Sequence, residues 1–293
     1  VEIMINPDGR LWVERHGSGR AESGAMSSAD SERVIRLVAS HAGRRADVGS
    51  PIVSAELPMG GERFEGVLPP VSPGPCFSIR KPAGRVIALD TYVASGVMAA
   101  HHAEALRRAV LDRENILVVG GTGSGKTTLA NALLAEIART GDRLVILEDT
   151  RELVSAARDA VQLRTQPGSV TLADLVRSTL RLRPDRIIIG EVRGAEALDM
   201  LKAWNTGHPG GIATLHANSA LSGLSRLEQL IGEASAQVPH DLIAETIDCV
   251  VYITRRAGLH RVETVARMNG LGREGYDLVP VQPDLQLVLP SLP

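Results

Sequence analysis

The chain has 293 residues, of which 44% are hydrophobic and 23% are charged, which is typical of a globular protein with one large domain or two ordinary ones. A formal net charge of −2 and only two tryptophans, three tyrosines and two phenylalanines argue against a nucleic-acid-binding surface, and no specific nucleic-acid binding is expected. The two cysteines form no Cys-x-x-Cys pair, which argues against a zinc module or a disulfide framework and fits a reducing cytosol.

The first 75 residues predict a small α+β domain built from two hairpins and one helix. The predicted elements are a hairpin of residues 1–5 and 10–14, a Gly- and Ser-rich loop over residues 15–25, a helix capped by Asp30 over residues 31–41, and a hairpin of residues 51–57 and 62–68. This domain has no cluster of His, Cys or paired acids, so its predicted role is packing and oligomerisation. Because the chain begins inside a predicted strand, we expect a further segment before it, which could hold an amphipathic helix.

A proline-rich segment, residues 69–75, ends this predicted domain. Four prolines in seven residues exclude a helix interior and a central strand. We predict a linker over residues 76–90 that begins with an edge strand at residues 76–80. Arg80 and Lys81 lie in this linker. They are either solvated charges or, placed against the nucleotide of a neighbouring subunit, groups that act as an arginine finger does.

Residues 91–293 predict an α/β domain with a mostly parallel sheet. The apolar strands are continuous and separated by helices, a pattern typical of a parallel sheet covered on both faces. The predicted strands are residues 116–119, 143–149, 186–191, 212–215, 250–254 and 261–267. The predicted helices are one that contains Met98, His101 and His102, one at residues 129–137, one between Thr171 and Pro184, and those at residues 194–206, 219–233 and 239–248. The tail from Gly270 is predicted to be irregular.

A glycine-rich turn connects the first of these strands to a helix. It reads Gly-x-x-x-x-Gly-Lys-Thr from Gly120 to Thr127, and such a turn wraps a phosphate with backbone N–H groups at a helix N-terminus. Lys126 is predicted to reach the β- and γ-phosphates of ATP, and the Thr127 hydroxyl to hold Mg²⁺. Such turns also occur by chance, but the flanking strand and helix argue against chance here. The predicted nucleotide-binding residues are Gly121, Thr122, Gly123, Ser124, Gly125, Lys126, Thr127 and Thr128.

Acidic and imidazole side chains follow three other predicted strands. Glu148 and Asp149 end one strand, Glu191 ends another, and His216 follows a third. The carboxyl ends of parallel strands are where an open α/β sheet binds its ligand. Either Glu148 or Glu191 could orient or deprotonate the attacking water, and the sequence leaves that choice open. The alternative role of Glu191 is a hydrogen bond to the backbone of the phosphate loop.

Two histidines, His208 and His216, flank the predicted strand at residues 212–215. We interpret them as candidate sensors of the γ-phosphate that move a loop when it leaves, against the alternative that each is a buried structural histidine. Without cysteine or a matched carboxylate, they are weak evidence for a metal site. The candidate arginines for charge neutralisation, each of which is otherwise a solvated surface charge, are Arg164, Arg181, Arg183 and Arg193.

Together, these motifs resemble the secretion-ATPase superfamily of type II and type IV secretion systems and pilus motors. In that superfamily a phosphate loop is followed by an acidic box, a Gly-Glu-x-Arg strand end and a two-histidine box. The matching segments are residues 120–128, 146–150, 189–193 and 206–219. The match extends from residue 1 to about residue 268, and residues 4–13 and 77–82 look like the TrbB-type conjugal transfer ATPases. The absence of a four-cysteine zinc module fits that branch.

The resemblance implies a RecA-like ATPase that binds ATP and Mg²⁺ and assembles into a homo-hexameric ring. The ring is expected at the cytoplasmic face of the inner membrane, with other type IV secretion components as partners. No apolar run approaches the ~18 residues of a membrane span, which fits a peripheral location. By the same resemblance, Glu148 matches the general base, Glu191 the second-strand acid and Arg80 a linker arginine that reaches the phosphates. His208 and His216 match the histidine box.

Four functions compete on this evidence. The first is a motor that hydrolyses ATP to ADP and phosphate to power substrate transfer or pilus biogenesis. The alternatives are a pilus retraction or assembly motor, which the motifs do not exclude, and a nucleotide-dependent scaffold with little turnover. The presence of Lys126, Thr127, Glu148 and Glu191 favours hydrolysis over a scaffold. A translocase that grips DNA directly is disfavoured by the near-neutral charge.

Overall fold

The computed structural model describes residues 2–15, 19–58, 60–81, 86–166, 168–273 and 275–283. The chain folds into two compact units, Val1–Gly84 and Arg85–Pro293, here called the N-terminal unit and the C-terminal unit. Within the described ranges, no helix combines the length and the apolar character that crossing a membrane requires.

The N-terminal unit is a six-stranded antiparallel sheet with the order β3-β2-β1-β6-β5-β4. Its elements are β1 (Glu2–Ile5), β2 (Arg10–Arg15), β3 (Gly19–Ala25), α1 (Ser28–His41), β4 (Ile52–Glu56), β5 (Arg63–Val67) and β6 (Cys76–Arg80). The fully buried Ile35 of α1 lies in one apolar cluster with Val53, Phe64 and Phe77 of the sheet. The two predicted hairpins, β1–β2 and β4–β5, are confirmed.

Four other predictions for this unit are wrong. Residues 15–25 do not form only a loop, because β3 lies within them and pairs with β2 although every residue of β3 is exposed. Ser27, and not Asp30, caps α1 by accepting the Asp30 N–H at 3.1 Å. The strand β6 pairs with both β1 and β5, so it lies inside the sheet and not at its edge. The proline-rich segment therefore connects two neighbouring strands, and the unit extends to Gly84 instead of ending at residue 75.

The C-terminal unit is built on an eight-stranded sheet with the order β14-β13-β12-β7-β11-β10-β8-β9. Its strands are β7 (Ile116–Gly120), β8 (Leu144–Glu148), β9 (Ala160–Arg164), β10 (Arg186–Ile189), β11 (Ile212–His216), β12 (Cys249–Arg256), β13 (Leu259–Gly272) and β14 (Gly275–Pro280). The strands from β12 to β9 pair in parallel, whereas β13 and β14 add antiparallel pairs. The predicted α/β class with a mostly parallel sheet is confirmed.

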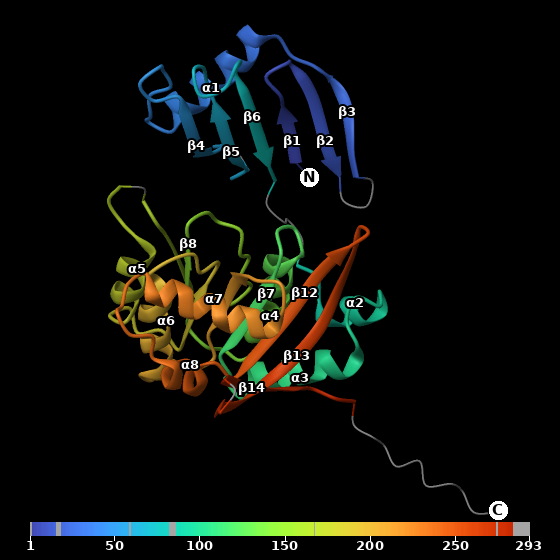
Figure 1. Ribbon diagram of the computed structural model, residues 1–293, viewed down its shortest axis with the longest axis vertical. Helices are drawn as coiled ribbons and strands as arrows, with labels where there is room; N and C mark the ends of the chain where they lie inside the picture. The colour runs from blue at the N-terminus through green and yellow to red at the C-terminus, as the bar shows by residue number, and fades with distance from the viewer. Residues whose placement is uncertain are drawn as a thin grey trace, which may run out of the picture. The chain divides into compact units, whose positions relative to one another are not determined.

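Both faces of this sheet are buried, which explains its continuous apolar strands. In β7, Ile116 and Val118 belong to one apolar cluster, whereas Leu117 and Val119 belong to another, because successive side chains point to opposite faces. The first three helices of the unit cover one face, and the four later helices cover the other (Figure 1). They are α2 (Leu89–Ala94), α3 (Ala100–Leu111) and α4 (Lys126–Ile137) on the first face, and α5 (Leu172–Thr179), α6 (Glu196–Asn205), α7 (Ala220–Gly232) and α8 (His240–Thr246) on the second.

The structure corrects the predicted elements of the C-terminal unit in three places. The segment before the phosphate loop forms two helices, α2 and α3, and Met98 lies between them. The strand β9, which was not predicted, pairs with β8 at the edge of the sheet, where its residues stay exposed or half-buried. The tail predicted to be irregular continues β13 to Gly272 and then forms β14, because the two strands pair with one another.

Candidate nucleotide site

The glycine-rich loop runs from the end of β7 to the start of α4, as predicted. Gly123 and Gly125 have φ angles of 68° and 98°, in the left-handed region that residues with a side chain rarely adopt. Gly120 must be a glycine for a different reason, because a Cβ there would lie 2.3 Å from the Ile253 carbonyl oxygen of β12. The loop therefore has the tight backbone and the helix N-terminus that a phosphate-binding loop requires.

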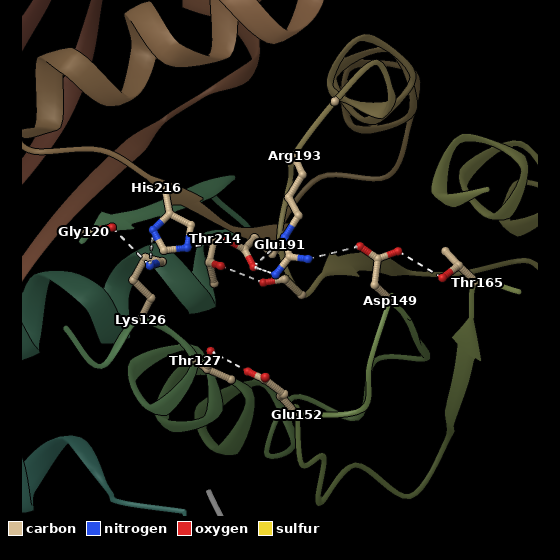
Figure 2. Close-up of polar contacts among 12 residues, drawn as sticks. Gly120, Lys126, Thr127, Asp149, Glu152, Thr165, Glu191, Arg193, Thr214 and His216 are labelled. Atoms are coloured by element: carbon tan, nitrogen blue, oxygen red, sulfur yellow. Dashed lines mark hydrogen bonds and ion pairs between the residues drawn. The ribbon is translucent and has the colours of Figure 1, made fainter. Parts of the chain in front are cut away.

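Lys126, the first residue of α4, is almost completely buried beside this loop. Its Nζ donates to the carbonyl oxygens of Gly120 at 3.1 Å and Gly121 at 3.0 Å, and lies 3.3 Å from Nδ1 of His216 (Figure 2). The parallel register of β7 and β11 causes this last contact, because it aligns Gly120 with His216. The loop and the histidine at the end of β11 thus meet at one edge of the sheet.

Glu191 connects this histidine to an arginine at the same edge (Figure 2). Glu191 Oε1 lies 2.7 Å from Nε2 of His216, and Glu191 Oε2 accepts a hydrogen bond from Nε of Arg193 at 2.9 Å. Partial burial acts to lower the pKa of the Arg193 guanidinium, but the hydrogen bond to Glu191 and the nearby charge of Asp149 outweigh it and raise that pKa. Glu191 Oε2 is therefore held by Arg193, whereas Oε1 lies close to the His216 imidazole without a hydrogen bond of good geometry among the described residues.

Glu148 ends β8 and is only 3% exposed. Its Oε1 accepts two backbone hydrogen bonds, from the N–H of Glu152 at 2.9 Å and of Leu153 at 2.8 Å. Its Oε2 is buried and has no hydrogen-bond partner among the described residues. Burial raises the pKa of this carboxyl above its ordinary value, although the two backbone hydrogen bonds oppose the shift. Gly190 makes room for the side chain, because a Cβ at that position would lie 2.9 Å from Glu148 Cγ.

Thr127 faces the loop that follows Glu148 (Figure 2). Its Oγ1 donates to Oε2 of Glu152 at 3.2 Å. Asn131, one turn further along α4, holds the same loop through a hydrogen bond from Nδ2 to the Glu152 carbonyl oxygen at 3.3 Å and another from the Val154 N–H at 2.8 Å. A hydroxyl and a carboxylate oxygen thus lie together beside the phosphate loop, and both are ligand types that Mg²⁺ prefers.

Comparison with known proteins identifies the family. Residues 32–275 match the model of the family described as type II/IV secretion system protein. The chain belongs to this family. It is 55% identical over 278 residues to the conjugal transfer protein TrbB of Rhizobium radiobacter, which covers 94% of this chain and 86% of that relative. It is 38% identical over 294 residues to the type IV secretion system protein PtlH of Bordetella pertussis, which covers 88% of this chain and 86% of that relative.

Solved structures of secretion ATPases have the same fold as this family member. The VirB11 ATPase from the Brucella suis type IV secretion system is 30% identical, with a TM-score of 0.53 over 91% of this chain and 88% of that chain. The pilus retraction motor PilT has a TM-score of 0.66 over 97% of this chain and 80% of that chain, but at 20% identity the likeness concerns the fold alone. The chain is thus a member of the secretion ATPases with conjugal transfer and type IV secretion relatives, a family that binds nucleotide.

The structure of this secretion ATPase does not bring every predicted site residue to the phosphate loop. His208 precedes β11, so it lies at the opposite, amino-terminal edge of the sheet, where its Nδ1 is 3.0 Å from the Pro184 carbonyl oxygen. The sequence placed both histidines beside the nucleotide, and for His208 the described fold contradicts that placement. Arg181 and Arg183 precede β10 and lie at the amino-terminal edge too.

The other two predicted arginines, Arg164 and Arg80, do not lie at the amino-terminal edge. Arg164 ends β9 at the carboxyl edge, opposite Glu148 in the β8–β9 register. Arg80 ends β6 in the N-terminal unit, so its predicted role at the phosphates remains a prediction.

Sequence reasoning missed several residues that build this site. Glu152 and Asn131 carry no motif signal, because their contacts depend on how the loop after β8 folds onto α4. Gly190 was predicted only as part of the Gly-Glu-x-Arg strand end, although its missing side chain is what accommodates Glu148. His260 of β13 was also missed, and its Nδ1 lies 2.9 Å from the Ser124 carbonyl oxygen.

Proposed function

We propose that this chain is a Mg²⁺-dependent ATPase that works as a homo-hexameric ring and hydrolyses ATP to ADP and phosphate. The ring lies on the cytoplasmic face of the inner membrane with other type IV secretion components and powers substrate transfer or pilus biogenesis in a conjugal transfer system. The 55% identity with the conjugal transfer protein TrbB of Rhizobium radiobacter, over most of both chains, supports the assignment to conjugation.

Nucleotide binding is assigned to the loop from Gly121 to Thr128. The positive φ angles of Gly123 and Gly125 support this assignment, because a backbone in that conformation can present successive N–H groups to a phosphate. Lys126 supplies the cation for the β- and γ-phosphates. Its burial beside the loop makes the attraction between its charge and a phosphate stronger than the same attraction in bulk water. The buried Ser124 Oγ, without a hydrogen-bond partner among the described residues, also fits a polar ligand at this position.

The general base is assigned to Glu148, and this assignment rests on one observation. One oxygen of Glu148 is held by two backbone N–H groups, while its other oxygen is buried with no hydrogen-bond partner in the described parts of the chain. That second oxygen is able to accept a proton from an attacking water. Glu191 is less suited to this role, because Arg193 forms an ion pair with its Oε2 and the His216 imidazole lies 2.7 Å from its Oε1. The raised pKa of Glu148 supports its basicity at neutral pH.

Thr127 and Glu152 are the residues that would hold Mg²⁺. The bound ion would neutralise charge on the phosphate oxygens. Among the described residues, no group of three or more His, Cys, Asp or Glu side chains forms a protein-only metal site. This fits Mg²⁺, which commonly binds through one or two protein oxygens together with substrate phosphates and water.

The residues assigned to a response to the γ-phosphate are His216, Glu191, Arg193 and Arg80. His216 contacts both Lys126 and Glu191. Loss of the γ-phosphate would therefore act on the Glu191–Arg193 pair through Lys126 and the His216 imidazole. Arg80 is proposed as the linker arginine that reaches the phosphates. This role depends on how the subunits of the ring assemble.

The test is the ATPase rate of size-resolved fractions, measured for the wild type, Lys126→Ala and a control variant, Lys202→Ala. Lys202 lies exposed on α6, outside the site, so its variant controls for the loss of one lysine charge. We expect activity only in a ring-sized species, a loss of at least about 100-fold in Lys126→Ala, and little change in Lys202→Ala. Near-normal turnover of Lys126→Ala would contradict the assigned phosphate loop. Rings that bind but do not hydrolyse ATP would favour the scaffold function.

A further inference from the structure

The hairpin of β12 and β13 lies directly against the phosphate loop, although about 130 residues of sequence separate them. Figure 1 shows these two long strands side by side, and in the sheet order β12 is the neighbour of β7. The contact has three points. His260 Nδ1 lies 2.9 Å from the Ser124 carbonyl oxygen, the Ile253 carbonyl leaves no room for a side chain at Gly120, and a Cβ on Gly123 would lie 3.8 Å from Nη1 of Arg255.

The contact with the Ser124 carbonyl determines which ring nitrogen of His260 carries the proton. A carbonyl oxygen only accepts hydrogen bonds, so Nδ1 of His260 must carry the hydrogen and donate it to Ser124. The peptide unit between Ser124 and Gly125 is planar and trans, so its C=O and N–H point in opposite directions. When His260 holds the Ser124 carbonyl, the Gly125 N–H is directed away from the hairpin.

We propose that His260 is a positioning residue for nucleotide binding: it holds the Ser124–Gly125 peptide so that the Gly125 N–H is presented to a phosphate of the nucleotide. The inference rests on the proposed function and adds a residue outside the phosphate-loop motif. The hairpin also packs closely on Gly125, because a Cβ there would be in van der Waals contact with His260 Nδ1 at 3.4 Å and with Ile253 Cδ1 at 3.5 Å.

The imidazole can be removed without dismantling the hairpin. His260 is paired with Arg255 in the antiparallel register, and the register continues from Cys249–Arg267 to Arg256–Leu259. These are backbone hydrogen bonds that a substitution at position 260 leaves in place. Variants at this position are therefore expected to fold, and an effect on nucleotide binding can be separated from an effect on stability.

The test compares three substitutions of His260 that differ in where they place an N–H donor. In His260→Asn the side-chain amide nitrogen sits at about the position of Nδ1, in His260→Gln it lies further out, and His260→Leu has none. His41→Leu, on the exposed end of α1 in the N-terminal unit, is the matched control. The dissociation constant of a fluorescent ADP analogue with Mg²⁺ is measured for each full-length variant, together with KM, kcat and the melting temperature.

We expect His260→Leu and His260→Gln to weaken nucleotide binding by about tenfold, the equivalent of one hydrogen bond, and His260→Asn to stay within about threefold of the wild type. KM should rise more than kcat falls, with melting temperatures unchanged. Binding by His260→Leu as tight as the wild type would overturn the proposal, and so would equal losses in the Asn and Leu variants. A wild type that does not bind the analogue, or binds it no better than Lys126→Ala, would overturn the proposed function itself.

Discussion

The carboxyl-terminal and amino-terminal ends of the strands, here called the carboxyl edge and the amino-terminal edge of the sheet, carry the same kinds of side chains. Their contacts differ. At the carboxyl edge, His216, Glu191 and Arg193 form a chain of contacts that leads to Lys126. At the amino-terminal edge, Arg186 donates from Nε to Asp142 Oδ2 at 2.6 Å, and Arg113 pairs with the other oxygen of Asp142.

The two edges differ in how their central carboxylates, Asp142 and Glu148, are paired. At the amino-terminal edge, both oxygens of Asp142 have partners. Arg186 is only 1% exposed, and the carboxylate of Asp142 neutralises its charge. At the carboxyl edge, Glu148 Oε2 and Ser124 Oγ are buried without a hydrogen-bond partner among the described residues. Buried polar atoms are normally paired, so unpaired ones beside a glycine-rich loop point to a ligand. Near the amino-terminal edge, Glu114 Oε2 and Thr246 Oγ1 are also unpaired among the described residues, so the position beside the glycine-rich loop is what distinguishes Glu148 and Ser124.

The largest expected effect at the carboxyl edge comes from Glu148→Gln. The amide keeps the size of the side chain but cannot accept a proton, so we expect kcat to fall by about 100-fold to 10,000-fold. Nucleotide affinity should change little, because the phosphate loop is intact. Steady-state ATPase assays and nucleotide titrations measure the two quantities, and Glu191→Gln is the comparison. A larger loss of kcat in Glu191→Gln than in Glu148→Gln would move the general base to Glu191.

The pH dependence sharpens this test of Glu148. Burial raises the pKa of its carboxyl, so the carboxylate form is lost at a higher pH than for an ordinary glutamate, whose pKa is about 4.3. The rate should therefore fall on the acid side of the profile at a pH above that value. An acid limb at or below pH ~4.3 would contradict the assignment of Glu148 as the base.

At the amino-terminal edge, the largest expected effect is on stability. Arg186→Met removes the buried partner of Asp142 and leaves only the more exposed Arg113 to neutralise its charge, so the free energy of unfolding should fall by about 3–5 kcal/mol. Chemical denaturation at pH 7 measures this loss. The control is Arg177→Met, which removes an arginine from an exposed pair with Asp199 and should cost under about 1 kcal/mol.

The sign of the pH effect on this pair follows from the pKa of Asp142. Burial acts to raise that pKa, but hydrogen bonds from Thr140 and Arg186 and the charges of Arg186 and Arg113 outweigh burial and lower it. A lowered folded-state pKa means that the stabilisation is fully present above the unfolded value of about 3.9 and is lost as the pH falls through the folded value. A difference between wild type and Arg186→Met that grows in acid would contradict this account.

The smallest expected effects separate the two histidines. His216→Ala removes contacts to Lys126 and Glu191, so turnover should fall by about tenfold, the equivalent of one charge-assisted hydrogen bond. His208→Ala loses only a contact to the Pro184 carbonyl, so turnover should stay within about twofold, with about 1 kcal/mol less stability. Paired ATPase and denaturation measurements test both. Equal losses of turnover would restore His208 to the site.

The sequence by itself determined the features that are encoded locally. The phosphate loop could be predicted because its glycines, lysine and flanking strand and helix are consecutive in the chain. The fold class could be predicted because continuous apolar strands alternate with helices. Glu148, Glu191 and His216 could be predicted as candidates, since each ends a strand whose neighbours are parallel and therefore place their ends at one edge.

Only the tertiary structure decided what depends on pairing between distant segments. The exposed strand β3 and the edge strand β9 lack a strong apolar pattern, so they form because a neighbouring strand supplies their hydrogen bonds. His208 lies away from the site because it precedes β11 instead of following it. His260 and Glu152 reach the phosphate loop through the packing of β13 and of the loop after β8. Contacts of this kind are set by strand order and packing, and neither is written in the residues next to them.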